Sequence, residues 1–141
     1  MVDGLYAFLQ GIGFHHPLHP AMTHLPVGLV LACFIFSILS FAFSRPDLLR
    51  TAYHCCLLAA AGLVLAAATG LLDWLHRYGG NLESLIIIKM VLAPLLLSTL
   101  LVAAWQAGSG ARAGRMVLLY GLASLFATGL GFAGGELVYG G

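Results

Sequence analysis

Charged side chains are scarce in this sequence of 141 residues, which has six Lys or Arg and five Asp or Glu. Charged residues make up 8% of the chain and hydrophobic residues 61%, whereas a soluble domain carries about 25% charged residues. So few charges cannot cover the surface of a soluble globule, and the net charge of +1 gives no basic face for nucleic acid. The composition excludes a soluble enzyme, a disordered chain and a nucleic-acid-binding protein, and it indicates an integral membrane protein.

Cysteine is also rare, and its spacing matches no redox, zinc or c-type haem motif. Cys33, Cys55 and Cys56 all lie in apolar runs, where cysteine usually acts as a small hydrophobic residue. The sequence shows no nucleophile and base arranged as in a hydrolase. We therefore do not expect a stand-alone enzyme.

Long stretches without charge define the organisation of the chain. Arg50 and Asp73 enclose 22 uncharged residues, and two later pairs of charges enclose 22 and 20. A helix needs about 20 apolar residues to cross the hydrocarbon core of a bilayer. The predicted spans lie near residues 21–44, 51–76, 84–107 and 114–137. Because the connections are short, consecutive helices must be antiparallel, so the predicted fold class is all-α, an integral membrane up-down four-helix bundle.

The first 18 residues have a different pattern. Leu5, Phe8, Leu9 and Ile12 fall on one helical face, which is typical of a short helix lying on the membrane surface. We therefore divide the chain into an N-terminal interfacial segment, residues 1–18, and the four-helix bundle, residues 19–141.

The basic residues of the short loops predict the orientation in the membrane. The first and third loops contain four arginines, whereas the other side has only Arg77 and, within the third span, Lys89. We expect the first and third loops to be cytoplasmic. Both termini and the loop at 77–83 are then expected on the outer side.

Histidine is as frequent as Lys and Arg together, and most histidines fall on the predicted outer side. They are His15, His16, His19, His24 and His76. His24 begins the first span and His76 ends the second, so the two are expected at one depth. Asp73, Lys89 and Glu136 arrive at about the same depth, and we predict that they form an intramembrane charge network, either structural or functional.

One face of the second span carries small residues and leads to the histidines. It consists of Gly62, Ala66, Thr69, Gly70, Asp73 and His76. Small residues allow two helix backbones to approach closely in lipid, or they leave room for a flat cofactor. The residues alone keep both possibilities open.

Three functions are possible for this end of the bundle. Two histidines from adjacent helices can ligate a b-type haem, and we predict that His24 and His76 are the axial ligands of its iron. Asp73 would then orient the His76 imidazole. His19 and His54 are the substitute ligands. The other two functions are a transition-metal site and a proton or ion path.

Three strings of residues carry a resemblance to a known family. They are His19-Pro-Ala-Met-Thr-His24-Leu-Pro, Thr69-Gly-Leu-Leu-Asp73-Trp74 and Gly134-Gly-Glu-Leu-Val-Tyr139. Over roughly residues 17–139 the chain resembles the bacterial four-span membrane family named domain of unknown function 2231. The resemblance implies four membrane helices, a prokaryotic origin and relatives that look like small cytochrome b-type subunits.

The function expected from these observations is that of a small subunit of the bacterial inner membrane. It would bind b-type haem and carry electrons between a quinone pool and a partner protein, within a redox complex or a homo-oligomer. The alternative is a non-catalytic scaffold or assembly subunit of a larger membrane complex. A transporter-like protein that binds a metal or another ion is the third possibility.

Overall fold

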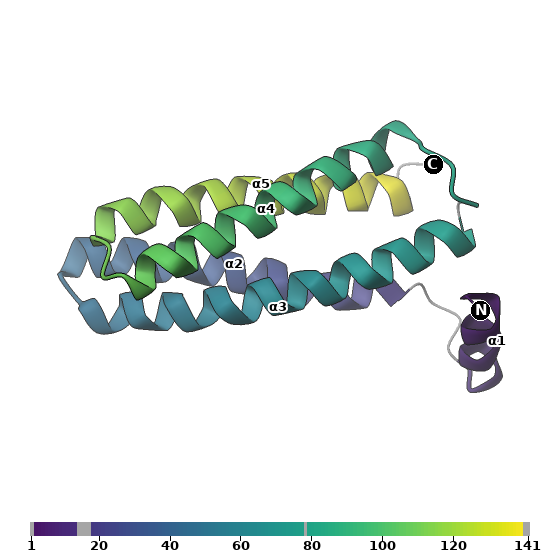
Figure 1. Ribbon diagram of the computed structural model, residues 1–141, viewed down its shortest axis with the longest axis horizontal. Coiled ribbons are helices and arrows are strands. Elements are labelled where there is room, and N and C mark those ends of the chain that lie inside the picture. The colour runs from purple at the N-terminus through teal and green to yellow at the C-terminus, as the bar shows by residue number, and fades with distance from the viewer. Residues whose placement is uncertain (1, 14–17, 78, 140–141) are drawn as a thin grey trace.

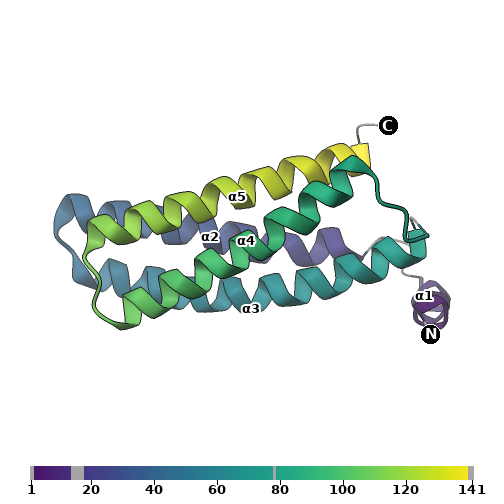
Figure 2. The same ribbon diagram turned by 45° about the horizontal axis from the view of Figure 1, so that its top comes forward.

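The computed structural model describes residues 2–13, 18–77 and 79–139, and these contain five helices and no strand. The helices are α1 (Val2–Gly11), α2 (Leu18–Phe43), α3 (Pro46–Arg77), α4 (Ser84–Gly108) and α5 (Ala113–Tyr139). The last four form an antiparallel bundle in which each helix packs against the next and α5 packs back against α2 (Figures 1 and 2). The predicted all-α up-down bundle is confirmed.

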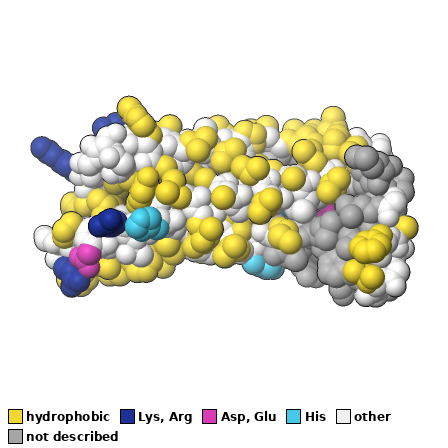
Figure 3. All heavy atoms as spheres, turned by 60° about the horizontal axis from the view of Figure 1, so that its bottom comes forward, with side chains coloured by type: hydrophobic (Ala, Val, Ile, Leu, Met, Phe, Trp, Pro, Cys, Tyr) yellow, Lys and Arg dark blue, Asp and Glu magenta, His cyan; other side chains and the backbone are white. Residues whose placement is uncertain are grey.

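Each bundle helix is long and apolar enough to cross a membrane. The shortest of these stretches, Met22–Phe43, has 22 residues, and at 1.5 Å per residue it is about 33 Å long, against about 30 Å of hydrocarbon. Large hydrophobic side chains are exposed along the length of the bundle, as one face shows in Figure 3. The fold is that of a four-span membrane protein.

Much of the interior of the bundle follows a seven-residue repeat, with small side chains at most of the buried positions of α2 and α3. The buried positions that follow this repeat are Pro26, Val30, Cys33, Ser37 and Ser40 on α2; Ala52, Cys56, Ala59, Leu63, Ala66 and Asp73 on α3; Leu96, Leu100 and Ala103 on α4; and Met116, Tyr120, Ala123 and Ala127 on α5. Alternating steps of three and four residues keep one seam of each helix facing its partners. Lipid is as apolar as these side chains, so close packing rather than water exclusion stabilises the bundle.

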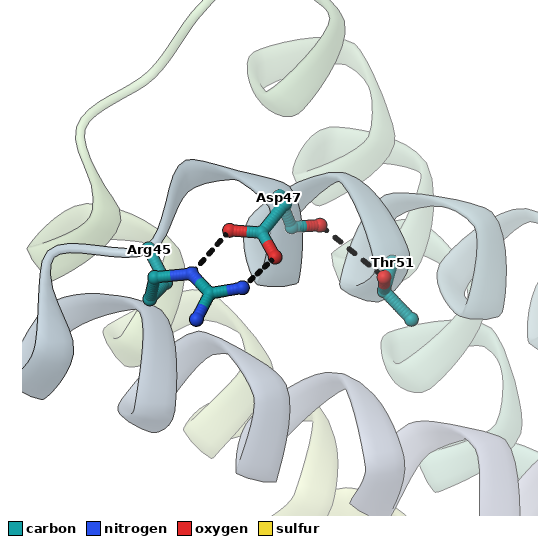
Figure 4. A network of polar contacts seen from close by, with 3 residues as sticks. All are labelled: Arg45, Asp47 and Thr51. Atoms are coloured by element: carbon teal, nitrogen blue, oxygen red, sulfur yellow. Dashed lines mark hydrogen bonds and ion pairs between the residues drawn. The ribbon is translucent and has the colours of Figure 1, made fainter.

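The turn between α2 and α3 differs from its prediction. The first two spans were predicted near residues 21–44 and 51–76, which left residues 45–50 between them, but α3 begins at Pro46. Proline suits the first position of a helix because that position needs no N–H donor. Arg45 donates two hydrogen bonds to the Asp47 carboxylate in the first turn of α3, at 2.9 and 2.7 Å (Figure 4).

The other two loops end their helices with glycines. Gly80 has a φ of +77° and its N–H donates to the Trp74 carbonyl, while the Trp74 indole donates to the Asn81 carbonyl. Gly110, also at +77°, follows α4 in the same way. At the α3–α4 end, α1 lies beside α3 and across the long axis of the bundle (Figures 1 and 2).

Candidate functional site

Three ionisable side chains from three helices influence one another electrostatically near the α3–α4 end of the bundle. They are His19 in the first turn of α2, Asp73 near the end of α3 and Lys89 in the second turn of α4. His19 lies seven residues before Pro26, and Asp73 seven residues after Ala66, so both continue the interior seams. We call these three residues the polar layer.

The Asp73 carboxylate caps the beginning of α2. Its side chain is only 6% exposed, and Oδ2 accepts a hydrogen bond of 2.9 Å from the backbone N–H of His19. The first N–H groups of a helix have no partner within the helix and carry a partial positive charge. A buried carboxylate at this position is therefore stabilised by α2 itself.

The His19 imidazole lies against the small-residue face of α3. Its Nδ1 is 2.8 Å from the Ala66 carbonyl oxygen, and because a carbonyl only accepts, Nδ1 carries the hydrogen and Nε2 is free of one in the neutral ring. A Cβ at Gly70 would be 2.9 Å from the same Nδ1, so only glycine at 70 allows this approach. Burial, and next the positive charge of Lys89, lower the pKa of His19 below its ordinary value of 6.5.

Lys89 completes the layer from α4. It is half-buried, it interacts electrostatically with Asp73, and its Nζ is 3.9 Å from where a Cβ on Gly134 of α5 would lie. The layer thus contains one carboxylate, one ammonium and one imidazole. A neutral His19 leaves the first two charges to balance each other.

The structure places the predicted site residues at different depths and at both ends of the bundle. Lys89 and Asp73 interact electrostatically, and Glu136 is exposed on α5, so the charge network of all three residues stays a prediction. His76 is half-buried one turn beyond Asp73 and interacts with its surroundings. His54 is exposed at the opposite end of the bundle, with its ring centroid 5.6 Å from that of Tyr53.

His19 and His24 occupy different faces of α2. The predicted first span, near residues 21–44, left His19 before its beginning, but α2 begins at Leu18 and includes His19. A proline in the first turn removes an N–H that has no partner there, so it does not end the helix. His24 lies five residues further, about 140° round the helix, and its side chain is exposed. His15 and His16 lie outside the described residues.

Hydrogen-bonding groups also lie inside the other half of the bundle, which sequence reasoning treated as apolar. The Cys33 thiol donates to the Ala52 carbonyl and the Cys56 thiol to the Leu100 carbonyl, both at 3.3 Å, so these cysteines pack as small residues joining neighbouring helices. Tyr120 of α5 is fully buried close to Cys56. Tyr120 lies seven residues before Ala127 on α5, so the seven-residue repeat is the signal in the sequence that places it inside the bundle.

The α2–α3 interface does not fit a haem as it is packed here. A Cβ on Gly62 would lie 3.4 Å from the Pro26 ring, and the His19 imidazole occupies the space beside Gly70. The small residues of α3 therefore serve close helix packing, which was one of the two predicted possibilities. Among the described residues, no three His, Cys, Asp or Glu side chains are grouped as metal ligands, so a transition-metal site has no support in this part of the chain.

The fold and the polar layer define a helical membrane protein of four spans with ionisable groups inside one end. Comparison with known families agrees with this class. The chain belongs to the family of predicted membrane proteins named domain of unknown function 2231, which matches residues 15–141. No curated protein and no solved structure shows significant similarity to the chain.

Proposed function

We propose that this protein is a small membrane subunit that takes up and releases a proton at His19. The observation that carries the proposal is the position of His19, whose half-buried imidazole lies at a helix start capped by the Asp73 carboxylate and within the electrostatic influence of Lys89. Ionisable groups within a membrane bundle are costly and usually serve proton or ion transfer, or pair with one another. Histidine is the side chain whose charge changes near neutral pH.

The chemistry of the site follows from the tautomer of His19. Nδ1–H remains bonded to the Ala66 carbonyl, so an incoming proton adds to Nε2. The imidazolium is attracted by Asp73 and repelled by Lys89, and the repulsion makes the proton easy to release. A site of this kind suits a subunit that exchanges protons at the membrane boundary, with partner subunits of a larger membrane complex.

Nuclear magnetic resonance of the histidine rings tests the proposal in detergent-solubilised protein. One imidazole should titrate with a midpoint below 6.5, and His19→Gln should remove that titration. Lys89→Met should move the midpoint of His19 upward, because it removes the repelling charge. Arg50→Gln, at the other end of the bundle, is the control and should leave the midpoint in place.

Two results would contradict the proposal. In the first, His19 titrates at or above 6.5 and Lys89→Met leaves it unchanged, which means that the layer does not influence the imidazole. In the second, the His19 imidazole does not gain and lose a proton reversibly. A purely structural layer, as in the scaffold alternative, would lower stability in both variants without any movement of a titration midpoint.

The haem-dependent electron transfer expected from the sequence stays a prediction. What supports it is the presence of His24 and His76 towards the same end of adjacent antiparallel helices, and what opposes it is the filled α2–α3 interface. An absorption spectrum of protein produced with haem available decides the question. A Soret band that shifts on reduction and disappears in His76→Ala would support haem binding at His76, and a colourless protein would exclude it.

A further inference from the structure

The two ends of the bundle carry opposite charge although the whole chain has a net charge of only +1. Four arginines and one aspartate lie at the α2–α3 and α4–α5 turns, giving that end a charge of +3; they are Arg45, Arg50, Arg112, Arg115 and Asp47. The remaining two basic and four acidic residues give the other end a charge of −2. We call the first the arginine end, and Lys and Arg side chains gather on it at the left of Figure 3.

A cavity of about 460 Å³ opens at the arginine end, between the first turns of α3 and the end of α4. Its polar side chains are those of Arg50 and Tyr53 from α3. Leu49, Gly108 and Ala111 supply apolar surface and backbone around them. The cavity is therefore mixed in character, with a cation and a phenol on one wall.

The arginines at this end differ in whether their charge is already paired. Arg45 is held by both carboxylate oxygens of Asp47. Arg50, Arg112 and Arg115 are exposed and form no ion pair with any residue that the structure describes. The guanidinium at the cavity is thus available to an anion, and two further positive charges on the α4–α5 side raise the local potential.

The position of the cavity along the bundle indicates which kind of anion it would bind. It lies at the ends of the candidate spans of α3 and α4, and since both spans are longer than the hydrocarbon core requires, we infer that these ends reach the level of the lipid headgroups. Guanidinium groups bind phosphate oxygens through paired hydrogen bonds, and basic pockets between membrane helices bind anionic headgroups. Tyrosine is enriched at the same level. We propose that this cavity binds the phosphodiester headgroup of an anionic phospholipid, with Arg50 contacting the phosphate and Leu49 and Ala111 contacting the glycerol and acyl carbons.

The test measures phospholipid retained by the full chain after purification in detergent, by native mass spectrometry. Phosphatidylglycerol should be retained in preference to phosphatidylcholine when both are offered in equal amounts. Arg50→Gln should reduce the bound phosphatidylglycerol about tenfold. Arg45→Gln is the matched control, because it removes the same charge from the same end but outside the cavity, and it should retain most of the lipid.

A second variant tests whether lipid retention depends on the space in the cavity as well as on the charge of Arg50. Gly108 lines the cavity and a Cβ there would meet no atom within 4 Å, so Gly108→Leu adds a side chain in open space. It should reduce lipid retention without changing the charge. Equal losses in Arg45→Gln and Arg50→Gln, or no preference between the two lipids, would overturn the proposal. Displacement of the lipid by inorganic phosphate at equal concentration would overturn the assignment to a phospholipid.

Discussion

At the scale of single residues, Gly70 determines how closely α2 approaches α3. Gly70→Ala would place a Cβ 2.9 Å from His19 Nδ1, so the imidazole must move and lose its bond to the Ala66 carbonyl. We expect a loss of about 1–3 kcal/mol in the free energy of unfolding, the cost of a buried group left without its partner. Unfolding of purified protein by sodium dodecyl sulfate, followed by circular dichroism, measures this loss.

A matched glycine provides the control for this substitution. Gly131 lies on an exposed face of α5, and a Cβ there would meet nothing within 4 Å. Gly131→Ala should therefore be neutral or stabilising by up to about 1 kcal/mol, because alanine is the better helix former. Equal effects at the two positions would mean that the contact between His19 and Gly70 has no energetic weight.

The protonation of His19 predicts how stability depends on pH. The pKa of His19 is lowered in the folded protein, chiefly by burial, so between that value and 6.5 the unfolded chain binds the proton that the folded chain does not. Stability from this group is fully present above 6.5 and is lost as the pH falls through the window below it. Thermal unfolding between about pH 7 and 5 should show this loss.

The variant His19→Asn isolates this contribution. An asparagine amide replaces the Nδ1–H donor but has no proton to gain in this range. We expect the difference in midpoint between the wild-type protein and His19→Asn to shrink or reverse on acidification. A difference that stays constant from pH 7 to about 5 would show that His19 does not titrate within the fold.

At the scale of helices, the turn between α2 and α3 contains one residue in a costly conformation. Ser44 has a φ of +52°, and the N–H of Arg45 donates to the Ser40 carbonyl. This is a common way for a helix to end, but the residue at the position of Ser44 is usually glycine. A non-glycine residue in the left-handed region costs about 1 kcal/mol. Ser44→Gly should stabilise the protein by about that amount in the same unfolding measurement.

The comparison variant is Ser109→Gly at the end of α4. Ser109 has a φ of −88°, so glycine brings no conformational relief and only adds freedom to the unfolded chain. Ser109→Gly should be neutral or slightly destabilising. If both serine variants changed stability alike, the strain at Ser44 would not be the cause.

The helices also show how far sequence reasoning could reach at this scale. The ends of all four spans were predicted within five residues, because uncharged runs mark them directly. The part of α2 that matters for the site was nevertheless missed, because the predicted span began near residue 21 and His24 was favoured over His19 as a ligand. The interior seam of α2 passes through Pro26 and, seven residues earlier, through His19. This repeat places His19 inside the bundle, but only when the helix is continued through Pro20.

At the scale of the whole molecule, the four-span bundle was predictable and the state of its interior was not. Composition alone requires helices that satisfy their own backbone in lipid. Whether the small residues of α3 leave a gap or close it depends on the side chains facing them, and a single sequence does not specify those pairs. The position of Pro26 against Gly62 and of His19 against Gly70 is therefore a result of the structure.

The orientation of the bundle in the membrane is a prediction for the whole molecule. The arginine end should face the cytoplasm, because basic residues in short loops are retained there during insertion. Reporter fusions after Arg50 and after Arg112 should be active in the cytoplasm, and one at Gly80 on the outer side. The reverse pattern would place the polar layer at the cytoplasmic surface.

The separation of charge between the two ends also makes the molecule sensitive to voltage. Inverting the bundle in the membrane would move the charge of +3 at the arginine end to the other side and the charge of −2 at the opposite end the other way. The two movements together are equivalent to five elementary charges crossing the membrane. At about 100 mV this amounts to roughly 11 kcal/mol. An energised membrane that is negative on the arginine side therefore holds the protein in one orientation far more firmly than its nearly neutral composition suggests.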